Sequence, residues 1–335
     1  MYKKSSTSSR SPGDVQGQPV AKKTRLVHKT IIYDESVANQ WLDEPPLEVW
    51  DHHIIPLLGL RDLALSRHVC TFFEAYWQDK FSNNVLPLRV DLDVATIDRA
   101  MRVIEILSSR REYTKLNPFL VLLGKGDHQI TSSSTDPISG TENATTLGIT
   151  RSNVTFVGQG KDTTTVLGGF RVANVENINF KNMTVTNTSG DCNGISISNA
   201  KVELMDVAIK GCGIMGLHIP RSTSESTVVA TRCEFANNTY GVHVFGSSTS
   251  ATFNNCVFND NVGDGLYVAN KGTIHLHGEA TAIHSNKQVG IYAFGSGKVL
   301  IHLPSNHNTS YNNTGRDRFT YSGGTITNVD EEADN

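Results

Sequence analysis

Short segments in which apolar and polar residues alternate recur along the last two thirds of the chain. Residues 233–244 read CEFANNTYGVHV, and related segments precede and follow them. The related segments are VAIKGCGIMGLHI at 207–219, CVFNDNVGDGLYV at 256–268 and AIHSNKQVGIYA at 282–293. Because alternation with a period of two is typical of half-buried strands, the chain is predicted to stack one strand-built unit several times.

The repeat has a period of roughly 24 residues. Two series of positions show it: Gly194, Gly216, Gly241, Gly265 and Gly290, and Val154, Ile178, Val202 and Val228. Val, Ile, Thr and Phe dominate each unit, and Gly, Asn and Ser separate the strands, with no apolar stripe at helical spacing. The pattern predicts a mainly β protein, in which residues 93–329 form a right-handed parallel β-helix of about eight coils.

Two further sets of residues occupy equivalent positions in successive units. Asn238, Asn261 and Asn286 each precede a strand-opening Gly by three or four residues, so we expect a stacked turn ladder in which Asn takes the left-handed backbone. Cys233 and Cys256 are predicted to be stacked, buried thiols. With five cysteines and no CxxC pair, a disulfide scaffold or zinc site is not indicated.

Residues 96–108 have the pattern of an amphipathic helix. Its apolar face would hold Ile97, Met101, Ile104 and either Leu107 or Ile106. Together with the apolar segment FLVLLGKGDHQI at 119–130, this helix resembles the cap and first coil of pectate-lyase-like β-helices. Such a cap would cover unpaired strand edges at the end of the stack.

The N-terminal part has a different character. Residues 1–38 are rich in Ser and Lys and are predicted to be disordered. Residues 39–92 contain apolar positions at helical spacing, which predicts a small all-α domain of about three helices. The helical stretch within it, Asp43 to Phe81, has only about forty residues and buries little surface, so part of this apolar face is expected to meet a partner or the neighbouring domain.

The helical segment resembles an F-box. The matching features are an early Pro and Glu, an apolar pair, an L-x-D-L segment, a V-C pair and a final aromatic residue. The residues that the resemblance places in contact with a Skp-type adaptor are Pro46, Leu47, Val49, Ile54, Ile55, Leu60, Leu63, Val69, Phe73 and Trp77. The order Pro45-Pro46-Leu47 departs from the family's usual Leu-Pro start.

The resemblance implies a substrate adaptor of an SCF-type ubiquitin ligase. Its partners would be the Skp-type adaptor, the cullin ligase and an unknown protein client displayed to the ligase by the β-helix. The chain would be no enzyme, would need no cofactor, and would be cytoplasmic or nuclear. The alternative is an intracellular β-helix protein that binds or acts on polysaccharides.

Charge and candidate chemistry limit other classes. A net charge of −3 gives no basic footprint for nucleic acid, and no apolar run reaches membrane-spanning length. The acidic residues Asp206, Glu234, Asp260 and Asp264 are scattered, which predicts no catalytic set. His275, His277 and His302, and likewise His284 with His307, are expected to form polar ladders; a metal site is the less favoured interpretation. Residues 330–335 read as an acidic tail.

Overall fold

The structure is a computed structural model that describes residues 87–108, 112–135, 140, 142–190, 192–302 and 309–329. The predicted disordered tail, the acidic C-terminal tail and all ten predicted adaptor contacts, from Pro46 to Trp77, lie outside the described residues. The F-box prediction is therefore not tested by the structure. Among the described residues, no helix has the length and apolar character needed to cross a membrane.

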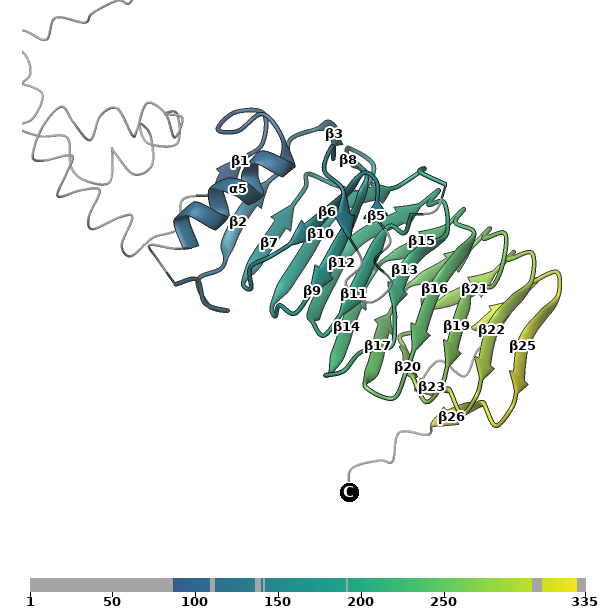
Figure 1. Ribbon diagram of the computed structural model, residues 1–335. Coiled ribbons are helices and arrows are strands. Elements are labelled where there is room, and N and C mark those ends of the chain that lie inside the picture. Colours follow the sequence, from purple (N-terminus) through teal and green to yellow (C-terminus); the bar gives the residue numbers. More distant parts are fainter. Residues whose placement is uncertain are drawn as a thin grey trace, which may run out of the picture. The chain divides into compact units, whose positions relative to one another are not determined.

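Two parallel sheets form most of the described chain (Figure 1). The first sheet follows the order β1 (Leu88–Arg89), β2 (Phe119–Leu122), β7 (Val154–Val157), β10 (Ile178–Thr186), β12 (Lys201–Lys210), β14 (Ser226–Thr231), β17 (Thr249–Asn254), β20 (Thr273–His277), β23 (Lys298–His302) and β26 (Thr325–Val329). Beside this path it includes β3 (Gly126–Gln129), β8 (Thr164–Leu167), β15 (Glu234–Ala236), β18 (Val257–Asn259), β21 (Ala282–His284) and β24 (Ser310–Tyr311).

The second sheet has eight strands, one from each successive layer. They are β6 (Thr146–Ile149), β9 (Gly169–Ala173), β11 (Ile195–Ser198), β13 (Met215–Ile219), β16 (Tyr240–Phe245), β19 (Leu266–Ala269), β22 (Val289–Phe294) and β25 (Arg316–Tyr321). A separate antiparallel pair joins β4 (Ser134–Thr135) to β5 (Glu142–Asn143).

The strand register confirms the predicted repeat. Ile178 of β10 pairs with Val154 of β7 and with Val202 of β12, so neighbours in the sheet are one sequence period apart. The coils contain about 25 residues, and there are about seven turns rather than the eight expected. Because β1 pairs with β2, the sheet begins at Leu88, a few residues before the predicted boundary at 93.

Apolar side chains from both sheets fill the interior of the stack. The Phe156 and Phe180 rings stack with their centroids 5.2 Å apart, and Phe235 and Phe258 stack at 5.0 Å. All four side chains are fully buried. Offset stacking of this kind adds to the stabilisation from burial, so the interior is held by aromatic columns as well as by aliphatic contacts.

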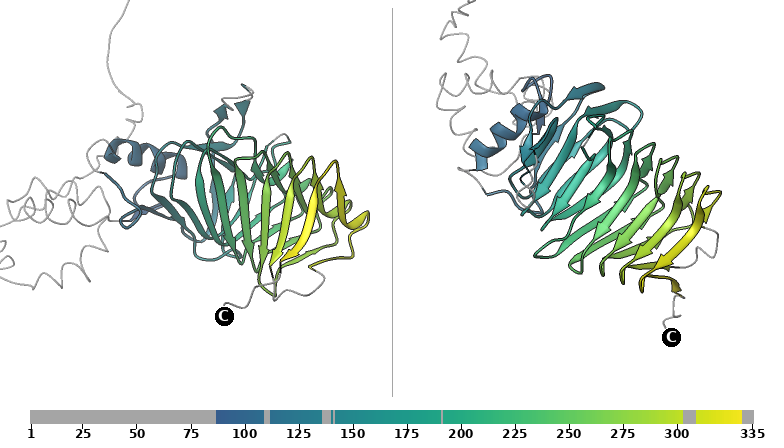
Figure 2. Two further views of the ribbon diagram at one scale, coloured as in Figure 1. Left: turned by 90° about the horizontal axis from the view of Figure 1, so that it is seen from below. Right: turned by 45° about the vertical axis from the view of Figure 1, so that its right-hand side comes forward.

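The capping helix is present as α5 (Ile97–Ser108), at the end of the stack next to β1 and β2 (Figures 1 and 2). Its buried face includes Ile97, Met101 and Ile104, as predicted. Of the two alternatives for the fourth position, Leu107 packs against the core whereas Ile106 is exposed. Asp98 fixes the helix to the first coils, since its carboxylate accepts hydrogen bonds from the backbone N–H groups of residues 131 and 132.

The predicted Asn ladder is confirmed, with one correction. The backbone N–H of Asn238 donates to the side-chain oxygen of Asn261, and that of Asn261 donates to Asn286. The left-handed backbone, however, belongs to the residue before each of them, with φ of 56° at Asn237 and at Asp260. The corner thus uses one residue for the turn and the next for the buried amide.

Candidate binding face

A column of aromatic side chains runs along the outer side of the second sheet. Four of them lie two residues after a strand-opening Gly, in the sequences Gly216-Leu-His, Gly241-Val-His, Gly265-Leu-Tyr and Gly290-Ile-Tyr, and Phe319 continues the column in register with Tyr292. Since successive side chains of a strand point to opposite faces, the residue after the Gly enters the core and the next one faces out. We call His218, His243, Tyr267, Tyr292 and Phe319 the aromatic ladder.

The rungs of the ladder are in register across five adjacent strands. The ring centroids of His218 and His243 are 5.6 Å apart, and those of His243 and Tyr267 are 4.4 Å apart. Tyr292 lies 5.0 Å from Tyr267 and 5.1 Å from Phe319. The separation follows the spacing of hydrogen-bonded strands, about 4.8 Å, so backbone pairing fixes the spacing of the rings.

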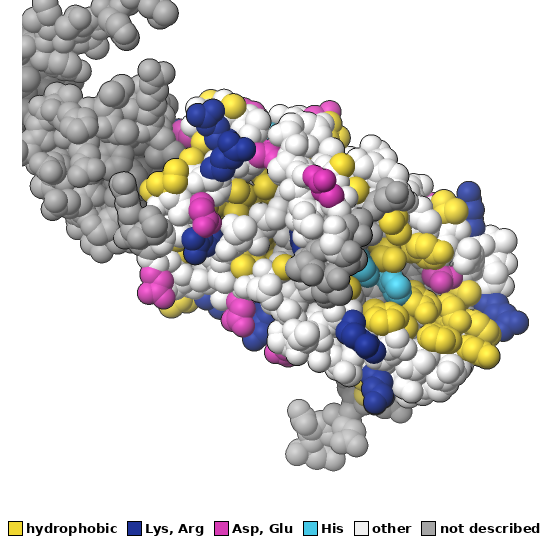
Figure 3. Space-filling model, in the orientation of Figure 1, with side chains coloured by type: hydrophobic (Ala, Val, Ile, Leu, Met, Phe, Trp, Pro, Cys, Tyr) yellow, Lys and Arg dark blue, Asp and Glu magenta, His cyan; other side chains and the backbone are white. Residues whose placement is uncertain are grey.

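A second, shorter column widens the apolar face. Phe245 lies beside His243, and Phe294 stacks on Tyr321 with centroids 5.9 Å apart. The Arg316 guanidinium lies 4.7 Å from the centroid of the Phe319 ring at the end of the ladder. Figure 3 shows hydrophobic side chains gathered on this side of the molecule, with histidine next to them. A contiguous patch of this kind, partly exposed, indicates a binding surface.

His243 is the least satisfied polar side chain of the ladder. Neither of its ring nitrogens has a hydrogen-bond partner among the described residues. Burial, followed by the nearby His218, lowers the pKa of His243 to about 3, so the ring is neutral at pH 7. Tyr occupies the same rung position at 267 and 292, so packing in this sheet does not require a histidine at 243.

The middle of the ladder carries hydroxyl groups and a buried acid. Burial, then the neighbouring Tyr292 and Asp264, raises the pKa of Tyr267, which keeps its hydroxyl protonated. Burial also raises the pKa of Asp264, although its carboxylate accepts a hydrogen bond of 2.9 Å from the Val289 N–H. The face therefore combines flat rings with a few hydrogen-bonding groups, as ligand sites commonly do.

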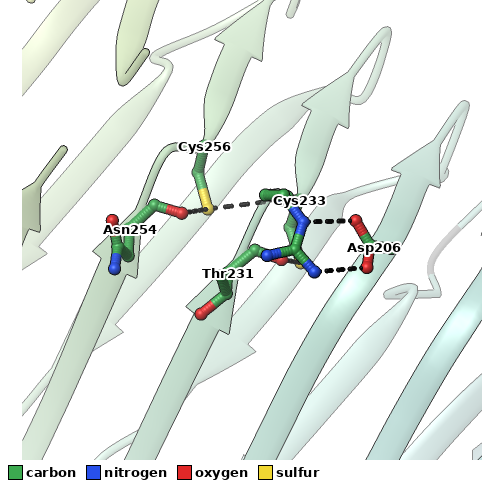
Figure 4. A network of polar contacts seen from close by, with 6 residues as sticks. Asp206, Thr231, Cys233, Asn254 and Cys256 are labelled. Carbon is green, nitrogen blue, oxygen red and sulfur yellow. Dashed lines mark hydrogen bonds and ion pairs between the residues drawn. The ribbon is translucent and has the colours of Figure 1, made fainter. Parts of the chain in front are cut away.

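The other acidic residues considered in the sequence take part in local contacts on the first sheet. Asp206 forms a two-point ion pair with Arg232, with distances of 2.8 and 2.6 Å (Figure 4). The hydrogen bonds from Arg232 lower the pKa of Asp206. Glu234 pairs with Lys210 at 2.9 Å, and Asp260 contacts Asn259. These carboxylates lie at separate corners and strands and are not brought together.

Cys233 and Cys256 are buried behind this ion pair, as predicted, in neighbouring coils (Figure 4). The Cys233 backbone N–H donates to the Cys256 sulfur at 3.4 Å. Cys256 in turn contacts the carbonyl oxygens of Ala230 and Asn254. The two thiols therefore fill a corner of the core in successive coils.

The predicted stacking of His302 on His277 is confirmed, and His275 joins the same group. His275, His277 and His302 form one cluster in which a nitrogen of each ring lies within 4.8 Å of the others. The stacked rings of neighbouring strands have centroid separations of 5.2 Å for His275 and His302 and 4.1 Å for His277 and His302, and their nitrogen atoms approach one another more closely than a simple ladder requires. His284 pairs in register with Tyr311, whose ring is stacked on it, and the expected partner His307 lies outside the described residues.

The aromatic ladder was missed at the level of sequence although its signal was present. The aligned glycines reveal the period, whereas the residue two positions later fits the ordinary strand alternation and so does not stand out. At this position, His or Tyr occurs in four successive units. A solvent-facing strand position needs only a residue such as Thr, Ser or Lys, so the repeated aromatic side chains were the signal.

Comparisons with known proteins agree with the fold. Residues 127–280 match the family described as the right-handed β-helix region. No curated protein matches the chain.

Among solved structures, ORF18 of Geobacillus virus E2 is 13% identical to this chain, with a TM-score of 0.45. The match covers 79% of this chain and 63% of the viral protein, so this chain spans less than two thirds of that protein's length. A pectin methylesterase mutant in complex with a hexasaccharide is 13% identical with a TM-score of 0.41, covering 75% of this chain and 94% of that one. The A-module of the mannuronan C-5 epimerase AlgE4 of Azotobacter vinelandii is 12% identical with a TM-score of 0.30, covering 73% and 79%. Together with the strand pairing, the family match identifies a right-handed parallel β-helix domain in this chain.

Proposed function

We propose that the β-helix binds an extended polysaccharide along the aromatic ladder. The observation that carries the proposal is the set of five partly exposed rings in register, spaced at 4.4–5.6 Å over five coils. A pyranose ring presents faces of C–H groups, which pack well on the negative faces of aromatic rings. The advance per sugar in an extended chain is close to the strand spacing, so consecutive sugars would meet consecutive rungs.

The polar groups of the face fit the same ligand. The hydroxyl groups of Tyr267 and Tyr292 can exchange hydrogen bonds with sugar hydroxyls. Both ring nitrogens of His243 are buried, so this rung offers a ligand the edge or face of its ring and no hydrogen bond. A flat face with polar edges also suits a chain of sugars better than it suits a protein partner, because protein interfaces are dominated by large apolar anchor residues.

The proposal is one of binding without turnover. Asp264 and Asp317 are acidic residues beside the ladder: the Asp264 carboxylate accepts the Val289 N–H of β22, and the Asp317 carboxylate on β25 accepts hydrogen bonds from Asn313. A glycosidase needs two carboxyl groups about 5–10 Å apart on either side of the bond. Incubation of the protein with each bound polysaccharide, followed by chromatography of the products, tests this: new chain ends or modified sugars would contradict it.

The binding experiment uses the full-length chain and a panel of immobilised neutral and uronic-acid polysaccharides. The double variant Tyr267→Ala/Tyr292→Ala removes two central rungs, and Tyr311→Ala is the matched control on the first sheet. We expect the double variant to lose on the order of tenfold to a hundredfold in affinity, because each ring contact is worth about 0.5–1.5 kcal/mol. Equal affinity of the three proteins, or no binding by the folded wild type, would contradict the proposal.

A second candidate function rests on the sequence pattern of residues 46–77. An adaptor that binds a Skp-type protein and the cullin ligase, and that presents a client on the β-helix, is a proposal supported by the apolar pair, the L-x-D-L segment and the V-C pair. The test is a pull-down of purified Skp adaptor with the intact chain and with the triple variant Leu47→Asp/Ile54→Asp/Leu63→Asp. Retention by the intact chain alone would support the adaptor, and no retention would exclude it.

A further inference from the structure

Three imidazoles meet on the outer side of the first sheet. His275 and His277 are two residues apart on β20, so they point to the same face, and His302 is the last residue of β23, the neighbouring strand. The His277 and His302 rings are stacked with centroids 4.1 Å apart. All three side chains are half-buried, so they are held in place but reachable from solvent.

The rings converge more closely than strand spacing alone would bring them. The Nδ1 atom of His275 lies 3.0 Å from the Nε2 atom of His302. One nitrogen from each of the three rings lies within 4.8 Å of the other two. Two strands thus supply three nitrogen donors to one point.

This spacing is near that of a tetrahedral metal centre. Zinc is bound by histidine nitrogens at about 2.0–2.1 Å, which places two such ligands about 3.4 Å apart. Shifts of about 1 Å, within the reach of side-chain rotation, would bring the three nitrogens to this geometry. Three protein ligands would leave the fourth position of the ion to solvent.

The donors of the cluster are all of one chemical kind. Three imidazole rings offer three nitrogen atoms to one point, and the neutral form of the ring is the form that binds a metal. Among the described residues, no other group of three or more His, Cys, Asp or Glu side chains has this convergence.

We propose that His275, His277 and His302 form a binding site for a divalent transition-metal ion, with zinc as the best-fitting ion. Three imidazole nitrogens are borderline ligands, which select Zn²⁺, Co²⁺, Ni²⁺ or Cu²⁺ over the oxygen-preferring Ca²⁺ and Mg²⁺. The site lies on the first sheet and the aromatic ladder on the second, so the two proposals succeed or fail separately.

The experiment measures Co²⁺ and Zn²⁺ binding to the full-length, tag-free protein after removal of metal by a chelator. Zn²⁺ affinity is measured by isothermal titration calorimetry at pH 7.5, and the absorption spectrum of the Co²⁺ complex reports the ligands. The variants are the double change His275→Gln/His302→Gln and, as a matched control, His284→Gln on β21, a half-buried histidine outside the cluster.

The wild type and His284→Gln are expected to bind one ion with the same affinity and to give the spectrum of a nitrogen-ligated Co²⁺ without a sulfur charge-transfer band. The double variant removes two of three ligands, so its affinity should fall by more than about 100-fold. Equal affinity of all three proteins, a sulfur-ligated spectrum, or no stoichiometric binding by the wild type would overturn the proposal. Thermal melts without metal establish that the variants are folded; if the double variant is not, His277→Gln takes its place.

Discussion

The Asn ladder and the aromatic ladder repeat with the same period, yet they lie on opposite sides of the backbone and differ in what surrounds them. The side-chain nitrogen of Asn261 donates to the Phe235 carbonyl at 3.1 Å and to the Asn286 side-chain oxygen at 2.8 Å. Its side-chain oxygen accepts the Asn238 N–H. On the aromatic ladder, by contrast, His243 has ring nitrogens with no partner among the described residues.

The difference separates repeats that the fold requires from repeats that it only permits. A buried amide whose bonds all go to neighbouring coils holds those coils together, and replacing it leaves backbone groups unpaired. A ring on the outer face could be exchanged for any strand-forming residue without loss of a backbone hydrogen bond. Repetition of the second kind is therefore the better indicator of a ligand.

Asn261→Leu should have the largest effect on stability. The substitution removes three hydrogen bonds of a fully buried side chain, among them the acceptor of the Asn238 N–H and a donor to the Phe235 carbonyl. We expect the free energy of unfolding to fall by about 3–5 kcal/mol. Urea unfolding followed by circular dichroism measures it.

The control for this prediction is Asn179→Ala. Asn179 faces outward from β10 and donates one side-chain hydrogen bond, of 3.3 Å, to Thr155. Its loss should change the free energy of unfolding by less than about 1 kcal/mol. If the two variants were equally stable, the assignment of the Asn ladder as the structural one would be wrong.

Gly265→Ala should have the next largest effect. A Cβ atom at Gly265 would lie 2.7 Å from the Asn286 side-chain nitrogen and 2.9 Å from the Gly290 carbonyl oxygen. The stack would have to open at this coil, at a cost of about 1–3 kcal/mol. Gly124→Ala is the control, because nothing lies within 4 Å of its Cβ position and its φ is ordinary; a similar loss there would show that the effect is not steric.

These contacts explain how far the sequence could predict the fold. The aligned glycines and the Asn positions are required by close packing between coils, so they keep their spacing and reveal the period. The α5 helix was predictable because its apolar face is regular. The number of turns was overestimated by about one, since the sequence pattern does not mark where regular stacking begins and ends.

The candidate sites were harder to predict. Strand register places His275 opposite Leu300 and would place His277 opposite His302. The convergence of His275 and His302 depends on the orientations of their rings, and the register does not specify these orientations. The aromatic ladder becomes visible only when the outward-facing position two residues after each Gly is compared between units. Packing constrains the exposed face little, so aromatic residues there look like the polar positions of an ordinary alternating strand.

A third prediction concerns pH and His243. The pKa of His243 is about 3 in the folded protein against an ordinary value of 6.5, so between these values only the unfolded chain takes up a proton. His243 therefore costs no stability above about pH 6.5. As the pH falls from 6.5 toward 3, proton uptake by His243 in the unfolded chain lowers the free energy of unfolding. At pH 5, His243 should lower the free energy of unfolding by about 1–2 kcal/mol relative to pH 7.

Replacement by Phe tests this prediction. Urea unfolding at pH 7 and pH 5 should show a smaller loss of stability for His243→Phe than for the wild type. His284→Phe, which replaces a half-buried histidine of the first sheet, is the control. An unchanged pH dependence in His243→Phe would mean that the imidazole is protonated in the folded state.

The smallest effect is expected from Tyr292→Phe, which keeps the ring of a central rung and removes its hydroxyl group. The ring contacts with Tyr267 and Phe319 remain, so the free energy of unfolding should change by less than about 0.5 kcal/mol. If stacking on the rings carries polysaccharide binding, calorimetric affinity should stay within about threefold of the wild type. A loss as large as that of Tyr267→Ala/Tyr292→Ala would show that hydrogen bonds from the hydroxyl groups, rather than the faces of the rings, select the ligand, and would redirect attention to the polar edge of the ladder around His243.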